Sequence, residues 1–424
     1  MTSVAPVRRT VRVPGDKSIS HRSLILAALS DGASVITGLL QSADVESTAR
    51  VLSTLGVQIE SDGKVVSVRG RGLRGLLIPD RRLNCGNSGT TARLMSGVLA
   101  AHPFDSTLTG DASLSRRPMR RATEPLEKMG ARFTFEGDKD GLPLIVHGGT
   151  LASIGWDSPT SSAQIKSAIL LAALNAQVGA TVTEPRRSRD HTERMLAARG
   201  VPVVVDGNSI SIGAARSMPA MDIHVPGDPS SAAFFVALAA LLPGRSIDLP
   251  GVCVNPTRTG FLDVVQRMGA LVSLDDYADA GGEPTAAIRA AGTESLYSVT
   301  IGADEMPSMI DEIPMLACLA ARAQGETVIT GAGELRVKES DRIGAVVRNL
   351  RAIGVDADER PDGMAIRGSR AQLVGAVETH GDHRLAMAFG VLGAVPGNSI
   401  EIATPECVAV SYPAFWSDPR RVAE

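Results

Sequence analysis

The chain has 424 residues, 44% of them hydrophobic and 3% aromatic, with a formal net charge of −3 at pH 7. This length suggests roughly two to four domains whose cores are built from Ala, Val, Leu and Ile. The weakly negative charge argues against a nucleic-acid-binding or membrane-surface protein, so any site for an anion must be local.

The sequence carries no targeting or membrane-spanning signal. The first residues, "MTSVAPVRRTVRVPG", lack the apolar segment of a secretory signal. The longest apolar runs are too short to span a bilayer. The four cysteines are scattered, without the spacing of a zinc site or a disulfide framework. We therefore expect a soluble, cytoplasmic protein.

Along the chain, six segments combine small polar residues with an apolar helix. Ser, Thr, Asp and Asn are favourable N-caps, and an apolar helix of about three turns follows them. One such segment alone is typical of a well-capped core helix, so the case for function depends on their number and their charges. The segments are residues 11–29, 84–101, 158–174, 223–241, 307–323 and 381–394.

Short segments with the alternation typical of β-strands lie between these helices. They are residues 64–70, 132–137, 143–148, 295–302, 327–333 and 364–368. The sequence therefore predicts an α/β protein in which strands, helices and hairpins recur several times in each half.

An internal repeat of one motif indicates a duplication. "VRVPGDKSISHRSLILAAL" begins at Val11 and "IHVPGDPSSAAFFVALAAL" begins at Ile223. The offset between Val13 and Val225 is 225 − 13 = 212, half of 424. Both copies are predicted to form a short strand, a Pro-Gly-Asp turn and an apolar helix, so we expect two similar halves.

Three helix starts carry cations and hydroxyl groups in addition to their caps. A helix N-terminus presents unpaired N–H groups and about half a positive charge, which suits a bound anion. The residues concerned are Lys17, Ser18 and Arg22 at the first start, Asn87, Gly89, Thr90 and Arg93 at the second, and Ser161, Ser162, Gln164 and Lys166 at the third.

We expect further basic residues in loops, and few acidic residues accompany them. The basic residues are Arg116, Arg117, Arg120, Arg121, Arg186, Arg187, Arg189, Arg336, Lys338, Arg342, His380, His383 and Arg384. The acidic residues are Asp311, Glu312, Glu339, Asp341 and Asp382. A cleft with many cations and one or two carboxylates suits small polyanionic substrates and general acid–base chemistry.

The usual cofactor motifs do not occur. No GxGxxG opens a βαβ unit and no GxxxxGK[ST] loop is present, so neither NAD nor ATP is indicated. The sequence also has no GxSxG elbow and no HExxH helix, and the histidines of "HGDHR" have no evident set of fellow ligands. We expect no cofactor and no metal.

The quoted motifs resemble those of one family over almost the whole chain. The chain resembles the enolpyruvyl transferases, in the branch of 3-phosphoshikimate 1-carboxyvinyltransferases (EPSP synthases). The matching blocks, in order, are "VPGDKSISHR", "NCGNSGTTARL", "LTGDASLSRRPM", "SSAQIKSAILLAAL", "SRDHTERML", "VPGDPSSAAFF", "DEIPMLA", "ELRVKESDRI" and "GDHRLAM".

The resemblance implies transfer of the enolpyruvyl group of phosphoenolpyruvate to the 5-hydroxyl of shikimate 3-phosphate, a step toward chorismate and the aromatic amino acids. It implies that shikimate 3-phosphate contacts Lys17, Ser18, Arg22, Ser161, Ser162, Gln164, Arg189, Asp311 and Lys338. It implies that phosphoenolpyruvate contacts Lys17, Asn87, Gly89, Thr90, Arg117, Gln164, Arg342 and Arg384. The implied catalytic groups are Asp311 as the base, Glu339 as the acid, and Lys17, Lys338 and His383.

The fold that the resemblance implies is an inside-out α/β barrel in two similar domains, each of three βαβαββ units, with the active site in the interdomain cleft. One domain would hold residues 1–14 and 227–424, and the other residues 15–226. The helices would fill the inside, the sheets would face out, and we expect a monomer.

The sequence departs from the family near its C-terminus. Many relatives have a lysine in the stretch that reads "CVAVSYPAF" here, and this chain has Val410 and no lysine nearby. The number of contacts to phosphoenolpyruvate is therefore expected to differ by at most one from that in those relatives. Gly89 is retained, so we expect inhibition by glyphosate in competition with phosphoenolpyruvate.

Three other interpretations stay open at this point. One is the sister enzyme that transfers enolpyruvate to UDP-N-acetylglucosamine, although that enzyme normally has a cysteine or aspartate before Arg-Pro, where "SLSRRPM" stands here. Another is a paralogue with a modified acceptor. The last is a non-catalytic anion-binding protein, which would be expected to have lost Asp311, Glu339 or Lys17.

Overall fold

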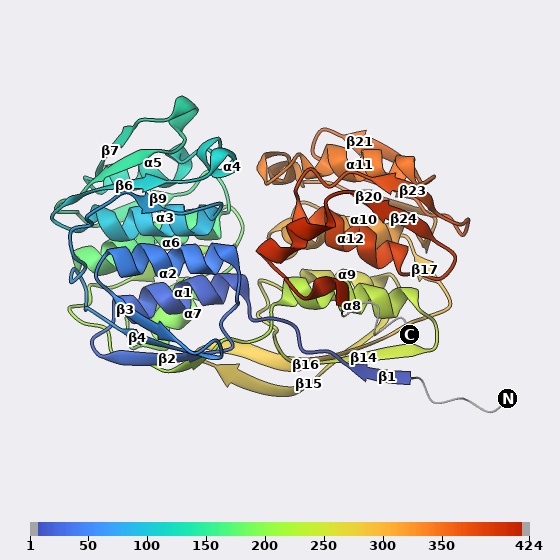
Figure 1. Ribbon diagram of the computed structural model, residues 1–424, viewed down its shortest axis with the longest axis horizontal. Helices are drawn as coiled ribbons and strands as arrows, with labels where there is room; N and C mark the ends of the chain where they lie inside the picture. The colour runs from blue at the N-terminus through green and yellow to red at the C-terminus, as the bar shows by residue number, and fades with distance from the viewer. Residues whose placement is uncertain (1–6, 418–424) are drawn as a thin grey trace. The chain divides into compact units, whose positions relative to one another are not determined.

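The computed structural model describes residues 7–417, and the contacts among them divide the chain into two units (Figure 1). The N-terminal unit consists of Gly15–Val225 and Asp279–Glu283. The C-terminal unit consists of the residues up to Pro14, Pro226–Ala278, and the residues from Pro284 onward. The expected domains did not include Asp279–Glu283, the tip of a β-hairpin, in the N-terminal part.

The N-terminal unit contains three sheets of the same design. In strand order, they are β13 (Ile223–His224), β2 (Ala33–Thr37), β4 (Val65–Arg69) and β3 (Gln58–Ser61); β5 (Leu83–Asn84), β6 (Asp105–Thr109), β8 (Leu144–His147) and β7 (Arg132–Phe135); and β9 (Ile154–Asp157), β10 (Ala180–Thr183), β12 (Ser209–Ile212) and β11 (Val203–Asp206). In each sheet the first two strands are parallel and the hairpin that follows is antiparallel.

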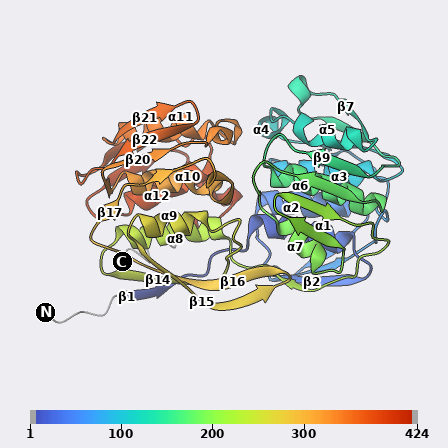
Figure 2. The same cartoon turned by 180° about the vertical axis from the view of Figure 1, so that it is seen from behind.

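The helices of this unit complete the three βαβαββ copies. They are α1 (Lys17–Ala28), α2 (Ala43–Thr54), α3 (Gly89–Ala100), α4 (Ala112–Ser115), α5 (Arg120–Lys128), α6 (Ala163–Ala176) and α7 (His191–Ala197). Helices α1, α3 and α6 are buried on nearly all sides, which their apolar composition requires. Figures 1 and 2 show them inside the unit, with the sheets on the outside.

The C-terminal unit repeats this design less completely. Its larger sheets are β1 (Val7–Thr10), β14 (Arg245–Cys253), β16 (Glu283–Ala291) and β15 (Leu271–Ala280), and β18 (Thr300–Ile301), β20 (Glu326–Ile329), β22 (Gly363–Arg367) and β21 (Asp356–Arg360). Two parallel pairs are β17 (Leu296–Tyr297) with β19 (Ala323–Gln324) and β23 (Val374–Val377) with β24 (Ser399–Ile402). The helices are α8 (Pro229–Leu241), α9 (Gly260–Arg267), α10 (Ile313–Ala320), α11 (Arg342–Ala352) and α12 (His383–Gly393).

The third copy in the C-terminal unit is shorter than the expected βαβαββ unit. Within the described residues it consists of β23, α12 and β24, without a second helix or a hairpin. Two 3-10 turns, Pro405–Val410 and Phe415–Ser417, follow instead. There Phe415 packs edge to face on Phe234 of α8 and on Trp416, so aromatic side chains cover this end of the core.

Each unit takes one edge strand from the other half of the sequence. Strand β1 precedes α1 in the chain but pairs with β14, and β13 precedes α8 but pairs with β2. The expectation of a strand at "VRV" was wrong, because β1 ends at Thr10. Val11 still donates its N–H to the oxygen of Asp248 at 3.0 Å, and the chain then enters the other unit after Pro14.

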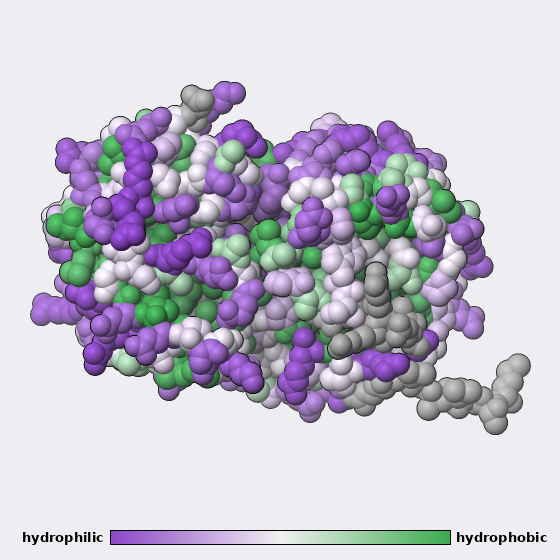
Figure 3. All heavy atoms as spheres, in the orientation of Figure 1, coloured by the Kyte–Doolittle hydropathy of each residue, from purple (hydrophilic) through white to green (hydrophobic). Residues whose placement is uncertain are grey.

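Hydrophilic residues cover much of the face of each unit shown in Figure 3. Among residues 7–417, no helix combines the length and the apolar character needed to cross a membrane. The apolar residues are instead concentrated in the cores around α1, α3 and α6 and around α8, α10 and α12.

Helices α3 and α6 approach closely at Gly97, which gives a first prediction. A Cβ atom at Gly97 would lie 2.1 Å from the backbone oxygen of Ala168. Gly97→Ala gains about 1 kcal/mol in helix propensity, but overpacking should outweigh it and lower the free energy of unfolding by about 1–3 kcal/mol. Urea unfolding measures the change. Gly149→Ala, where nothing lies within 4 Å of the added atom, is the control and should have little effect.

Candidate active site

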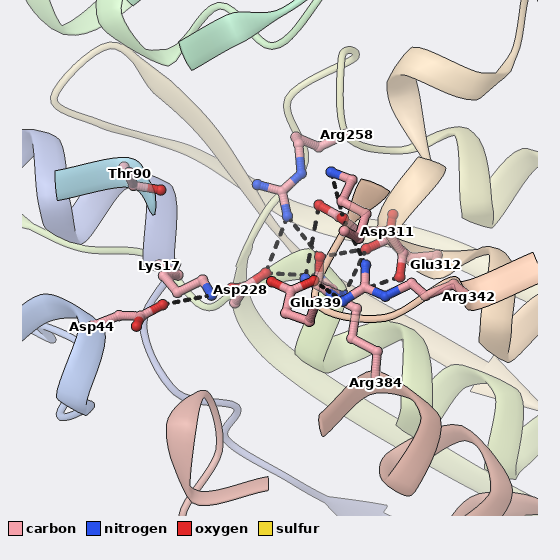
Figure 4. Close-up of polar contacts among 12 residues, drawn as sticks. Lys17, Asp44, Thr90, Asp228, Arg258, Asp311, Glu312, Glu339, Arg342 and Arg384 are labelled. Atoms are coloured by element: carbon pink, nitrogen blue, oxygen red, sulfur yellow. Dashed lines mark hydrogen bonds and ion pairs between the residues drawn. The ribbon is translucent and has the colours of Figure 1, made fainter. Parts of the chain in front are cut away.

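The first helix start places a lysine and an arginine through a capping aspartate. Asp16 accepts the N–H of Ile19 at 2.8 Å and so caps α1. Lys17 is then the first residue of the helix, and its Nζ lies 3.2 Å from Oδ2 of Asp44 at the start of α2 (Figure 4). Asp44 was not predicted as a site residue, because it lies 27 residues away in the sequence.

Arg22 is a buried cation one turn further along α1. Its Nε donates to Oγ1 of Thr192 at 2.7 Å, one terminal nitrogen donates to Oγ of Ser167 at 2.8 Å, and the other to the backbone oxygen of Ser18 at 3.0 Å. Burial lowers the pKa of Arg22 to about 10, and the nearby carboxylate of Glu193 opposes this shift. The guanidinium therefore stays charged at neutral pH.

His21 behaves differently from its neighbour. Burial lowers the pKa of His21 to about 3, so this histidine is neutral. Its Nδ1 lies 2.7 Å from Oγ1 of Thr48, which in turn lies 2.7 Å from Oγ1 of Thr91 in α3. The histidine in "SISHR" thus links three helices and adds no positive charge to the site.

The starts of α3 and α6 meet around one glutamine. Gln164 donates through Nε2 to Oγ1 of Thr90 at 3.0 Å, and its Oε1 accepts from Arg93 at 2.9 Å. Gly89 lies against the same arginine, because a Cβ there would be 2.7 Å from an Arg93 nitrogen. Arg93 therefore belongs to this cluster, although the sequence analysis assigned it no role.

Arg117 completes this cluster from the loop after α4. One of its terminal nitrogens donates to Oδ1 of Asn87 at 2.8 Å and to Oγ of Ser113 at 3.2 Å. A Cβ at Gly89 would lie 3.7 Å from the other terminal nitrogen. Five predicted residues are thus brought together in the N-terminal unit: Asn87, Gly89, Thr90, Arg117 and Gln164.

The loop before α6 packs on the basic loop before α7. Oγ of Ser161 donates to the backbone oxygen of Arg186 at 2.5 Å and accepts the N–H of Arg186 at 3.0 Å. The hydroxyl of Ser162 makes no helix-capping bond. Arg189 is close enough to Arg22 for its charge to contribute to lowering the pKa of that residue, so the two cations are neighbours.

In the C-terminal unit, Arg342 is surrounded by carboxylates. Its side chain is 1% exposed, and its Nε lies 2.7 Å from Oδ2 of Asp382. One terminal nitrogen lies 2.6 Å from Oε2 of Glu339, and the other lies 3.4 Å from Oδ1 of Asp311. Burial opposes this charge, but Asp382 and Glu339 outweigh it and raise the pKa of Arg342 above its ordinary value. Figure 4 shows Asp311 and Glu339 beside the guanidinium of Arg342.

Asp311 is approached by two further cations. Nζ of Lys338 lies 3.5 Å from its Oδ1, and a terminal nitrogen of Arg384 lies 3.9 Å from its Oδ2. Arg384 also donates to the backbone oxygen of Asp311 at 3.2 Å. The predicted residues Asp311, Lys338, Glu339, Arg342 and Arg384 therefore form one cluster.

His383 is the first residue of α12 and lies next to this cluster. It is buried. Burial opposes the charge on Asp382, but Arg342 outweighs burial and lowers the pKa of Asp382, with a smaller effect of His383 in the same direction. The half-buried Val410 ends a 3-10 turn. Whether a contact is lost at Val410 stays a prediction.

A second group of polar residues contacts this cluster, and none of them was assigned a role from the sequence. The buried Arg258 donates to Oδ1 of Asp228 at 3.2 Å and to Oγ of Ser230 at 2.9 Å. Ser230 donates to the carboxylate of Glu312, which lies 3.5 Å from Arg384. Asp228 could have been predicted, because it is the aspartate of the repeated Pro-Gly-Asp turn. No sequence pattern near Arg258 indicated its role.

The chemistry of both clusters suits anionic substrates and proton transfer. Guanidinium and ammonium groups bind phosphate and carboxylate groups, and Asp311 and Glu339 are carboxylates that could accept or donate a proton. Among residues 7–417, no group of three or more His, Cys, Asp or Glu side chains could hold a metal ion.

Comparison with known proteins gives a consistent result over the whole chain. The sequence profile of the EPSP synthase (3-phosphoshikimate 1-carboxyvinyltransferase) family matches residues 1–418. The 3-phosphoshikimate 1-carboxyvinyltransferase of Bacillus subtilis is 46% identical, covering 98% of this chain and 97% of its own. That of Gloeobacter violaceus is 48% identical, covering 100% of this chain and 99% of its own. A solved structure of EPSP synthase from Acinetobacter baumannii has a TM-score of 0.88 and 43% identity, and covers 98% of this chain and 96% of that one.

The carboxylates around Arg342 give a second prediction. Arg342→Met leaves the buried Asp382 without its cation, which should lower the free energy of unfolding by about 3–5 kcal/mol. The matched control is Arg367→Met in β22. Arg367 is exposed and pairs with three acidic residues of the sheet of β18, β20, β22 and β21, so the loss of stability should stay below about 1 kcal/mol. Urea unfolding of both variants measures the difference, and equal losses would contradict the prediction.

Proposed function

Because the chain belongs to the EPSP synthase (3-phosphoshikimate 1-carboxyvinyltransferase) family, we propose that the two clusters described above bind its substrates and carry out its proton transfers. The chain is an enzyme that transfers the enolpyruvyl group of phosphoenolpyruvate to the 5-hydroxyl of shikimate 3-phosphate and releases phosphate. The proposal concerns which residues do so, and it includes inhibition by glyphosate, a monomeric state and a cytoplasmic location.

The reaction requires an addition followed by an elimination. In the addition, the hydroxyl oxygen forms a bond to C2 of phosphoenolpyruvate and loses its proton, while the methylene carbon gains a proton. In the elimination, the C2–O bond to phosphate breaks and the new methyl group loses a proton. The enzyme therefore needs a base near the hydroxyl, an acid near the methylene, and cations for two phosphates and two carboxylates.

The N-terminal unit supplies groups for shikimate 3-phosphate and part of the phosphoenolpyruvate set. Ser161, Ser162 and Arg189 are proposed to hold the shikimate phosphate, and Ser18 and Arg22 its carboxylate. Arg22 is already oriented by Thr192 and Ser167, so its guanidinium needs little reordering when it binds an anion. Asn87, Gly89, Thr90, Arg117 and Gln164 form the phosphoenolpyruvate group of this unit, and Lys17 is proposed to contact both substrates.

The C-terminal unit supplies the proton-transfer groups. Asp311 is proposed as the base and Glu339 as the acid, with Lys338 and His383 assisting and Arg342 and Arg384 binding phosphoenolpyruvate. The observation that carries this assignment is the placement of Asp311 within 3.9 Å of the cationic nitrogens of Lys338, Arg342 and Arg384. Fixed cations hold the carboxylate in one position and also attract the anionic substrate.

Phosphate release tests this assignment. The native chain should release phosphate when phosphoenolpyruvate and shikimate 3-phosphate are both present, and not with either alone. Asp311→Ala should lower kcat by at least about a hundredfold, as expected for loss of a general base. The control is Asp358→Asn, a half-exposed carboxylate of the outer sheet, which should leave kcat unchanged. Release by the native chain with UDP-N-acetylglucosamine in place of shikimate 3-phosphate would contradict the proposed acceptor.

Gly89 gives a prediction about phosphoenolpyruvate and glyphosate. Gly89→Ala places a Cβ atom 2.7 Å from Arg93, which must move, and near Arg117. The KM for phosphoenolpyruvate should rise at least about fivefold and the inhibition constant of glyphosate should rise with it, while the KM for shikimate 3-phosphate changes little. Gly155→Ala in β9, where nothing lies within 4 Å, is the matched control. Non-competitive inhibition of the native chain by glyphosate would count against a shared site.

A further inference from the structure

Glu184 joins the two loops of the N-terminal unit that carry Ser162 and Arg189. It follows β10 directly, and its Oε1 accepts the backbone N–H of Ser162 at 2.9 Å. Its Oε2 accepts the backbone N–H of Ser188 at 3.1 Å, and the hydroxyl of Ser188 also donates to this carboxylate. One carboxylate therefore fixes the backbone on both sides of the proposed phosphate position.

Lys166 neutralises this carboxylate from within α6. Its Nζ lies 2.8 Å from Oε2 of Glu184 and 2.8 Å from Oε1 of Glu193 in α7, and all three side chains are at most 2% exposed. Burial opposes the charge on Lys166, but Glu193 and Glu184 outweigh it and raise its pKa, so the ammonium persists. From the sequence, Lys166 was expected at a helix start, without an assigned role.

The arrangement has an electrostatic reason. A carboxylate hydrogen-bonded to the N–H of Ser162 lies beside a position proposed for a phosphate, and two anions so close would repel each other. Lys166 reduces that repulsion while leaving Glu184 free to accept its hydrogen bonds. Because the cost of burying two charges can cancel their attraction, a buried ion pair need not stabilise the fold. We therefore consider that Lys166 and Glu184 position the loops.

Through Glu193, Lys166 also lies near Arg22, the residue proposed to hold the carboxylate of shikimate 3-phosphate. Its second partner, Glu193, is the carboxylate with the largest effect on the pKa of Arg22, after the effect of burial itself. Thr192, which accepts from Nε of Arg22, is the residue next to Glu193. Lys166 thus pairs with two carboxylates. Glu184 contacts the loops proposed to bind the shikimate phosphate, and Glu193 lies near Arg22, which is proposed to bind the carboxylate.

We propose that Lys166 and Glu184 are positioning residues for shikimate 3-phosphate. They hold the loops of Ser162 and Arg189 in the geometry that fits its phosphate, and neither contacts the reacting atoms. This inference rests on the proposed function, in which Ser161, Ser162 and Arg189 bind that phosphate. It predicts that changes at this pair affect one substrate and spare the other.

The test compares Lys166→Met, Glu184→Gln and the double variant by steady-state kinetics. Lys166→Met should raise the KM for shikimate 3-phosphate at least about tenfold and change the KM for phosphoenolpyruvate less than about twofold. The double variant should bind shikimate 3-phosphate better than Lys166→Met does, because removing the carboxylate removes the repulsion. The double variant should resemble Glu184→Gln alone, which is the non-additivity expected of an interacting pair.

Leu170→Ala in the same helix separates positioning from stability. Leu170 is fully buried one turn after Lys166, and its truncation should lower stability by leaving a cavity. Melting temperatures show whether this control is as destabilised as Lys166→Met. If the control raises the KM for shikimate 3-phosphate equally, or if Lys166→Met raises both KM values together, the positioning role is overturned. Should Lys166→Met not fold, an unchanged KM in Glu184→Gln overturns it.

The affinity for shikimate 3-phosphate, measured by calorimetry, tests the positioning role separately from the proposed function. Binding needs no turnover, so it reports on the loops even if the chain does not react. A native chain that binds shikimate 3-phosphate but releases no phosphate overturns the proposed reaction, and weaker binding by Lys166→Met still supports the positioning role. A native chain that does not bind shikimate 3-phosphate overturns both.

Discussion

The burial of helices that are apolar on every side is the constraint on which the other features depend. Such a helix can be buried only if the N–H groups at its start find partners, and short polar side chains supply them. Asp16, Ser88, Asp228 and Asp382 each accept a backbone N–H at the start of α1, α3, α8 and α12. Because the cap fixes the first turn, the residues after it are placed at the helix end, where the chemistry-bearing side chains are found.

Each unit contains a buried cation that is held by carboxylates. Arg342 has Asp382 and Glu339, and Lys166 has Glu184. The carboxylates orient the cations before a substrate arrives, which reduces the ordering cost of binding.

The two units use the same helix start for different purposes. In the N-terminal unit the capping Asp16 is followed by Lys17, which is partly exposed and pairs with Asp44. In the C-terminal unit Asp228 is followed by Pro229, which has no charge, and a buried arginine, Arg258, binds the cap from another loop. The duplicated turn is therefore structural in both units, and the cation comes from a different part of the chain in each.

The sequence by itself determined the six buried helices, some of the short strands and the residues that start several of the helices, because capping and periodicity depend on neighbours in the chain. Only the tertiary structure decided which sheet each edge strand joins, since β1 and β13 precede similar turns but pair with strands far along the chain. It also decided the partners of the cations. Asp44 lies 27 residues from Lys17 and Glu184 lies 18 from Lys166. Such pairs depend on packing between elements, which no local pattern records.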